Sequence, residues 1–412
     1  MGRKSVFGLM LCGVAATMLA APAFAQQDRV SATEKGSLLY FSKVELRWTL
    51  ENSEWVLSQD TFLQVTNDYP EDVDVLFYFV NGDRPLPAMG DERAHPGWNW
   101  VDNQLTLTAN QPVYWSAADG GILSPFTVLD PGDPPGRPAM DGTSDRVLRG
   151  FILGWAVDSI DGIEIRWNHL AGNATLVNYR FGAAFEYNAW AFQTVVDVEN
   201  GDPTGISDGQ LDLDGVEYAP PFAQLLMNFQ AVGSSAFTGG NRLVVSNTDV
   251  TLHPVSVDLR QETDGPVTTK AHFDVWNMNE VKFSGAYRCI TCWDQTLLSD
   301  YGIPNHFLID TLQTAHGKAR IDGLESQLCD ELPLFESEDA AILGIVFKIL
   351  FFDGNNEQTA VDLAAAGSNM FGMGTEPAVV KYDELGPPPE LPGGEKGDVI
   401  KFVDHLLNID RR

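Results

Sequence analysis

The sequence predicts a mainly β protein with two antiparallel β-sandwich domains. Short apolar segments with partial alternation recur between turn clusters, which is typical of sandwich strands. The strands do not alternate with helices, which argues against a doubly wound sheet. With 412 residues, 44% hydrophobic and 10% aromatic, the chain is large and apolar enough for more than one core.

The first domain is predicted over residues 37–200. Its clearest strands are residues 61–67 and 73–80, which flank the turn cluster 68–72. The second of these strands ends at Asn81-Gly82, a strong turn signal. The other strands predicted in this domain are residues 38–48, 105–108, 113–116, 147–157, 163–167, 175–179 and 185–198.

The second domain is predicted over residues 206–385, after a break at residues 199–205 that is rich in Gly, Asp and Pro. Residues 338–352 predict a short helix late in this domain, because acidic residues precede an apolar run. Residues 386–412 combine a stiff Pro/Gly linker with an apolar stripe at helical spacing. We therefore expect a C-terminal amphipathic helix, which packs on its own domain or on a partner.

The first 25 residues have the three-part layout of a secretory signal peptide. Arg3 and Lys4 form a basic start, an apolar stretch without acids follows, and an Ala-Phe-Ala motif ends at Ala25. This stretch is too short for a comfortable membrane span. We expect cleavage after Ala25, a linker over residues 26–36, and a mature protein exported to the periplasm, the cell surface or the medium.

The strong negative charge narrows the classes of partner. The chain has 26 Lys and Arg against 57 Asp and Glu, a formal net charge of −31. Phosphate binding requires basic patches, so nucleic acid is not an expected partner, and neither is an anionic membrane surface. The sequence does not identify the partner, and an envelope protein and a polysaccharide are the candidates. Ca²⁺ is the cofactor that such a surface favours, and the alternative is a solvated acidic surface that binds no ion.

Two strand segments resemble bacterial immunoglobulin-like domains. In residues 61–80 a strand ending Val65-Thr66-Asn67 turns into an alternating strand, and residues 271–283 repeat this pattern weakly. More broadly, residues 37–330 resemble a loose set of exported bacterial β-rich proteins. The resemblance implies an immunoglobulin-like fold and export of the protein, and it implies no activity.

Three cysteines, Cys289, Cys292 and Cys329, remain after Cys12 leaves with the signal peptide. Export favours a structural disulfide from Cys289 or Cys292 to Cys329, with one thiol left over. Redox catalysis by the Cys-x-x-Cys pair is an alternative, but its surroundings lack a βαβ pattern. A zinc site with His306 or His316 is another, although the ligand spacing is longer than usual.

Two further patterns suggest ligands. Asp208, Asp212 and Asp214 precede a glycine, the last two of them two positions apart, and form a candidate Ca²⁺ site in an irregular loop, because the segment lacks the spacing of an EF-hand. The same pattern also fits an acidic turn. Trp98 and Trp100 are candidates for stacking on sugars, or they fill a core if they continue a strand.

Recognisable catalytic motifs are missing from the sequence, including G-x-S-x-G, H-E-x-x-H and the P-loop. We therefore predict an exported, non-catalytic structural, adhesive or binding protein. The alternative is a carbohydrate-binding protein or a carbohydrate-active enzyme on a β-sandwich scaffold, because the carboxylate pairs of glycosidases need not be close in sequence.

Overall fold

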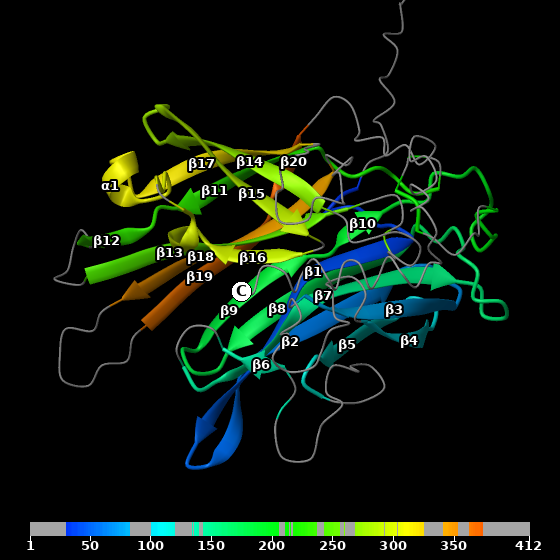
Figure 1. Ribbon diagram of the computed structural model, residues 1–412. Helices are drawn as coiled ribbons and strands as arrows, with labels where there is room; N and C mark the ends of the chain where they lie inside the picture. Colours follow the sequence, from blue (N-terminus) through cyan, green and yellow to red (C-terminus); the bar gives the residue numbers. More distant parts are fainter. Residues whose placement is uncertain are drawn as a thin grey trace, which may run out of the picture.

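The protein is mainly β, and its described residues form three antiparallel sheets (Figure 1). The computed structural model describes residues 30–82, 100–119, 134, 136–139, 143–205, 211–213, 215, 217–236, 243–255, 259, 268–291, 293–302, 304–324, 341–352 and 362–373. Figure 1 shows the sheets stacked in layers. We call them, from top to bottom in that view, the outer, middle and large sheets.

The large sheet has ten strands in the order β4-β3-β7-β1-β2-β8-β9, with β10, β5 and β6 paired to β1, β2 and β7. Its strands are β1 (Leu38–Glu51), β2 (Glu54–Asn67), β3 (Val73–Asn81), β4 (Trp100–Leu107), β5 (Pro112–Ser116), β6 (Arg137–Pro138), β7 (Arg146–Val157), β8 (Leu170–Asn178), β9 (Ala183–Asn188) and β10 (Trp190–Phe192).

The outer and middle sheets have five strands each. The outer sheet, in the order β15-β14-β17-β11-β20, contains β11 (Gln224–Gln230), β14 (Thr268–Asn277), β15 (Lys282–Thr291), β17 (His316–Leu324) and β20 (Phe371–Met373). The middle sheet, in the order β12-β13-β18-β19 with β16 paired to β13, contains β12 (Gly233–Ala236), β13 (Leu243–Pro254), β16 (Asp294–Leu297), β18 (Ile342–Phe352) and β19 (Asp362–Asn369). The described helices are a 3-10 turn (Leu298–Asp300) and α1 (Ile309–Leu312).

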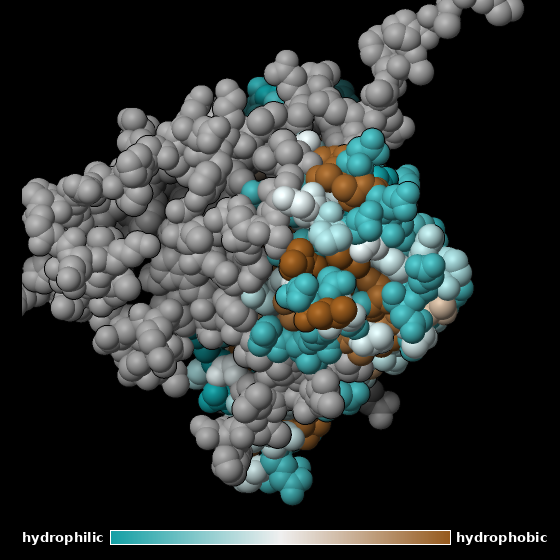
Figure 2. All heavy atoms as spheres, turned by 90° about the vertical axis from the view of Figure 1, so that its right-hand side faces the viewer, coloured by the Kyte–Doolittle hydropathy of each residue, from teal (hydrophilic) through white to brown (hydrophobic). Residues whose placement is uncertain are grey.

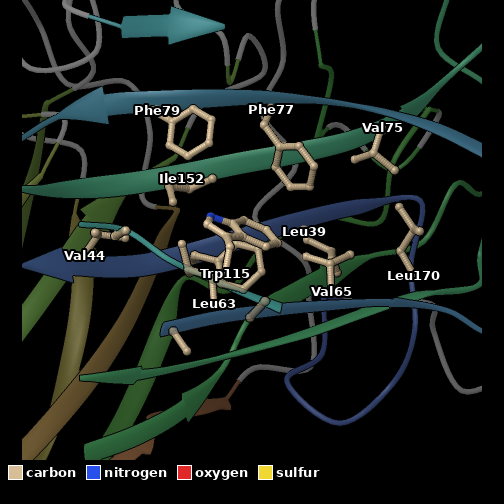
Figure 3. Close-up of a cluster of buried hydrophobic side chains, with 14 of the residues drawn as sticks. Leu39, Val44, Leu63, Val65, Val75, Phe77, Phe79, Trp115, Ile152 and Leu170 are labelled. Atoms are coloured by element: carbon tan, nitrogen blue, oxygen red, sulfur yellow. The ribbon is translucent and has the colours of Figure 1, made fainter. Parts of the chain in front are cut away.

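The centre of the middle sheet is buried on both faces. Toward the outer sheet, Val346 of β18 joins a core with Phe273 and Ile321. Toward the large sheet, Ile345 and Phe347 join a second core, where Figure 3 shows the side chains of several strands of the large sheet converging. Alternate residues of β18 therefore belong to the cores on opposite faces of the middle sheet, as the two-residue period of a strand requires.

The predicted helix at residues 338–352 is wrong, because residues 342–352 form strand β18. A strand that is buried on both faces needs apolar residues at nearly every position, so it lacks the alternation that marks a half-exposed strand. Such a run cannot be told from a buried helix by periodicity alone. The β-branched and aromatic residues of Ile342–Phe352 are the features that favour the strand.

Most strands predicted in the first half are confirmed, with shifted ends. The segment 163–167 is an exception, because Glu164 and Ile165 make only isolated bridges. The predicted segment 185–198 ends early, since β9 and β10 stop at Phe192. The C-terminal helix predicted in residues 386–412 lies outside the described residues.

One apolar cluster has members on both sides of the predicted domain boundary. Trp155 and Trp190 of the large sheet share this cluster with Tyr218 and Leu343. The division at residues 199–205 and the immunoglobulin-like class of the two halves therefore stay predictions. Figure 2 shows apolar groups in small clusters between hydrophilic ones on the described part of one face. In the part of the chain that is described, no helix has the length and hydropathy that crossing a membrane requires.

Candidate functional site

The exposed face of the outer sheet gathers aromatic and charged side chains. On β14, Ala271, Phe273 and Val275 are buried in the core beneath the sheet. Because successive side chains of a strand point to opposite faces, the residues between them face away from that core. We call the following six residues the outer sheet face: His272, Asp274, Trp276, Tyr287, Arg320 and Asp322.

Strand register brings these side chains together from three strands. Tyr287 of β15 lies opposite His272 of β14. On the other side of β14, Asp322 lies opposite His272 and Arg320 lies opposite Asp274. Directly opposed residues of an antiparallel pair share one face, so the strands form a continuous polar and aromatic surface.

The charges of this face neutralise one another. The Arg320 guanidinium donates from Nη2 to Oδ2 of Asp274 at 2.7 Å and from Nε to Oδ2 of Asp322 at 3.1 Å. Lys282 Nζ lies 2.9 Å from Oδ1 of Asp274. Two carboxylates therefore meet two cations, and no carboxylate of this network lacks a cation, in a chain whose net charge is −31.

The rings on this face are partly open to solvent. Tyr287 is 63% exposed, and the ammonium of Lys270 lies 4.5 Å from its ring centroid. Trp276 is half-buried, with Lys282 Nζ 5.5 Å from its ring centroid. Cation–π contacts of this kind help to hold a ring in place. The face thus combines positioned rings with fixed hydrogen-bonding groups, the two features of many small-molecule sites.

A bulge between β14 and β15 positions His272. The register shifts between Phe273 and Val275, and a side chain at Gly285 would lie 2.5 Å from Nε2 of His272 and 2.4 Å from the Phe273 carbonyl oxygen. Gly285 therefore allows the imidazole to lie directly over β15. The other ring nitrogen, Nδ1, is 3.9 Å from Oδ2 of Asp322.

A second polar cluster lies between the large and middle sheets. We call its seven residues the buried polar stripe: the buried Ser42, Lys43, Asp249, Thr251 and His253, and the half-buried Glu45 and Gln295. Lys43 Nζ donates to Oδ2 of Asp249 at 2.7 Å and lies 3.4 Å from Oε2 of Glu45. The Gln295 amide donates to the same oxygens, at 2.8 Å to Asp249 and 3.2 Å to Glu45.

Burial and neighbouring charge set the protonation states in this stripe. Burial by itself raises the pKa of Glu45, but the cations Lys43 and Arg149 outweigh it and hold the pKa below its ordinary value. Burial lowers the pKa of His253 to about 3, an effect that the Ser42 backbone partly offsets. The imidazole is therefore neutral, and its Nδ1 lies 2.6 Å from the Tyr40 hydroxyl.

A third cluster includes one of the predicted calcium ligands. Asp212 is buried, and its backbone N–H donates to Oε2 of Glu217 at 3.2 Å. The Thr204 hydroxyl donates to Oε1 of Glu217 at 2.8 Å. Burial, with smaller contributions from the charges of Glu164 and Asp212, raises the pKa of Glu217 to about 8. Within the described residues, no group of three or more His, Cys, Asp or Glu side chains is arranged to hold a metal ion.

Most of the other residues predicted as sites lie outside the described residues: Ala25, Trp98, Asp208, Asp214, Cys292 and Cys329. The Trp100 backbone begins β4 opposite Val80, and its side chain is likewise outside the description. Cys289 lies in β15 opposite Lys270. Because neither candidate partner is described, the pairing stays a prediction, as do the calcium site and the stacking tryptophans.

Sequence reasoning missed the outer sheet face, although a signal was present. Lys270, His272, Asp274 and Trp276 alternate with apolar residues along β14, which is the pattern of a strand with one exposed face. The partners on β15 and β17 are about fifteen and fifty positions away, and only the strand pairing brings them close.

Comparisons with known proteins find no match that indicates a function. No protein-family profile matches the chain, and no curated protein sequence matches it. A presumed secreted protein of Parabacteroides distasonis is 8% identical, with 72% of this chain and 88% of that chain covered, at a TM-score of 0.15.

Two other solved structures are equally distant. A glycosyl hydrolase family 2 member of Bacteroides cellulosilyticus is 7% identical over 81% of this chain and 36% of that chain, at a TM-score of 0.13. The CupB6 tip adhesin of Pseudomonas aeruginosa is 9% identical over 82% of this chain and 94% of that chain, at a TM-score of 0.12. At such TM-scores these similarities carry no argument about fold or function.

Proposed function

We propose that this protein is an exported, non-catalytic binding protein whose outer sheet face binds a polysaccharide. The observation that carries the proposal is the combination of Trp276 and Tyr287 with the Asp274–Arg320–Asp322 network on one face. Planar rings stack on the apolar faces of sugars, while fixed carboxylate and guanidinium groups exchange hydrogen bonds with sugar hydroxyls.

The pairing of both carboxylates on the face favours a neutral polysaccharide. Each carboxylate already has a cation within 3.1 Å, so a neutral ligand brings no unpaired charge to the surface. An acidic polysaccharide would meet the overall negative field of a chain with a net charge of −31. The calcium ion and the envelope location predicted from the sequence are compatible with this function and are not needed for it.

The test is a binding measurement with matched tyrosine variants. We expect Tyr287→Ala to weaken binding to a neutral polysaccharide about tenfold, the effect of roughly 1.4 kcal/mol, in isothermal titration calorimetry. Tyr114→Ala is the control, because Tyr114 is 64% exposed, as Tyr287 is at 63%, but lies on β5 of the large sheet. Equal affinities for the two variants, or no binding to any of a panel of neutral glucans, mannans and xylans, would contradict the proposal.

A carbohydrate-active enzyme is the second candidate, and Glu217 is the observation that favours it. A carboxyl group with a pKa of about 8 is protonated at neutral pH, as a general acid must be, and Asp212 and Glu164 lie close enough to influence it. Against this role, the Glu217 side chain is fully buried, so a substrate does not reach it without rearrangement. Release of reducing sugars that Glu217→Gln abolishes would establish the enzyme.

We also propose that the disulfide of Cys289 or Cys292 with Cys329 and the calcium site near Asp212 stabilise the exported protein. Mass spectrometry of the unreduced protein, with thiols alkylated, tests the first, and three alkylated cysteines would contradict it. Chelation with EGTA tests the second, because loss of an ion that binds only the folded state lowers the melting temperature. An unchanged melting temperature would contradict the calcium site.

A further inference from the structure

The buried polar stripe lies between the middle and large sheets, away from the outer sheet face to which we assign binding. Asp249, Thr251 and His253 alternate on β13, so they share one face of the middle sheet. This face packs on β1 of the large sheet, as the contacts of Lys43 with Asp249 and of Tyr40 with His253 show. Polar residues thus occupy a contact between sheets, where apolar side chains are usual.

Four buried side-chain oxygens of this stripe make no hydrogen bond within the described structure: Ser42 Oγ, Asp249 Oδ1, Thr251 Oγ1 and Gln295 Oε1. His253 Nε2 is a fifth polar atom of the stripe without a hydrogen bond there. Ser42 and Thr251 have no exposed surface, and Asp249 is 7% exposed. Thr251 lies opposite Gln295 in the strand register. Buried polar groups in native proteins nearly always have a partner, because an unsatisfied group has lost its contact with water.

The bonds that these residues do make leave the four atoms free. Asp249 accepts from Lys43 and Gln295 through Oδ2, which leaves Oδ1 available. Gln295 donates its amide N–H groups to Asp249 and Glu45, and this fixes the orientation of the amide with Oε1 turned away from the two carboxylates. The four free oxygens are therefore two acceptors and two hydroxyls, which both donate and accept.

The charges around the stripe select a small neutral ligand. A cation there would compete with the Lys43 ammonium, which already lies 2.7 Å from the Asp249 carboxylate. An anion would meet the carboxylates of Asp249 and Glu45. Water is neutral and brings two donors and two acceptors, which match two acceptors and two hydroxyls.

We propose that the buried polar stripe is a binding site for ordered water molecules that bridge β1 of the large sheet to β13 and β16 of the middle sheet. The bound water completes the hydrogen bonding of Ser42, Asp249, Thr251 and Gln295. The water is then part of the contact between the two sheets, and its hydrogen bonds are comparable in strength with the direct hydrogen bonds around it.

Two threonines on β13 give the test. Thr251→Val removes the hydroxyl that the proposal assigns to water, and it must lower the melting temperature. If the site is dry, the same change removes an unsatisfied group and leaves the melting temperature unchanged or raised. Thr248→Val is the control, because Thr248 is equally buried but exchanges hydrogen bonds with the Gln230 backbone at 3.0 Å. The melting temperature of this variant must therefore fall whether or not the stripe holds water.

A high-resolution crystal structure of the unaltered protein supplies the second measurement and does not depend on the variants folding. We expect solvent density within hydrogen-bond distance of at least two of the four atoms. A site without density, or an anomalous signal from a metal ion, would overturn the proposal.

Discussion

The buried polar stripe and the outer sheet face contain similar ion pairs in opposite surroundings. Lys43 meets Asp249 at 2.7 Å, and Arg320 meets Asp274 at the same distance. The side chain of Lys43 is 3% exposed, whereas that of Arg320 is 38% exposed. One pair therefore fixes the contact between two sheets, while the other leaves hydrogen-bonding groups within reach of a ligand.

This difference follows from the layer in which each pair lies. Between the large and middle sheets, both partners have left water, so each depends on the other to offset its desolvation. On the outer sheet, water still solvates the guanidinium and screens its charge, so the pair contributes little to stability. An ion pair thus stabilises the contact between the large and middle sheets, while a similar ion pair on the outer sheet is available to bind a ligand.

The largest expected effect is at Lys43. Lys43→Met keeps the apolar stem but leaves Asp249 and Glu45 without their shared cation, and we expect a loss of about 3–5 kcal/mol in the free energy of unfolding. Urea denaturation measures it. The double variant Lys43→Met/Asp249→Leu is the control and is expected to recover part of the loss. A loss below about 1 kcal/mol in the single variant would show that the stripe is as well solvated as the outer face.

An intermediate effect is expected from the buried carboxyl of Glu217. Its pKa of about 8 in the folded protein exceeds the ordinary 4.5, so the stability from its protonated form is complete below pH 4.5 and is lost as the pH rises through about 8. We expect the free energy of unfolding to fall by about 1–2 kcal/mol between pH 7 and pH 9. Urea denaturation across this range measures the fall.

Glu217→Gln is the matched variant and is expected to flatten this pH dependence. His253 does not contribute in the same window. Its folded-state pKa of about 3 lies below the ordinary 6.5, so its effect on stability is complete above pH 6.5 and is lost only as the pH falls toward 3. Parallel curves for the variant and the original protein would show that Glu217 is ionised in the folded state.

The smallest effect is expected on the outer sheet. Arg320→Ala leaves Asp274 with Lys282 at 2.9 Å, so we expect a loss of only about 0.5–1 kcal/mol in urea denaturation. Lys318→Ala removes a pair with Glu280 in which both side chains are well exposed, and a loss of at most about 0.5 kcal/mol is expected. A loss at Arg320 that equals the loss at Lys43 would remove the distinction between the two clusters.

Local patterns predicted much of the fold, and their failure at β18 is instructive. Residues 73–80 alternate and end at a turn signal, and β3 forms there. Residues 342–352 do not alternate, because β18 lies in the middle sheet and serves a core on each face. The sequence shows that such a segment is buried, but whether it is a strand or a helix depends on what covers it.

The candidate site was less accessible to prediction than the fold. The sequence predicts Trp98 and Trp100, which are neighbours on one segment, whereas the outer sheet face combines Trp276 with Tyr287 and Arg320 from three strands. Sequence motifs show residues that are close along the chain. Strand pairing shows residues that are close in space.

The sequence by itself determined the β-rich class, the acidic balance and most strand positions in the first half, because composition and two-residue periodicity are local properties. It also predicts export, through the composition of residues 1–25. The tertiary structure alone decided which polar residues are buried and which are exposed. Lys43 and Arg320 are both cations on β-strands, and only the stacking of the three sheets places one in a buried contact and the other at the edge of solvent.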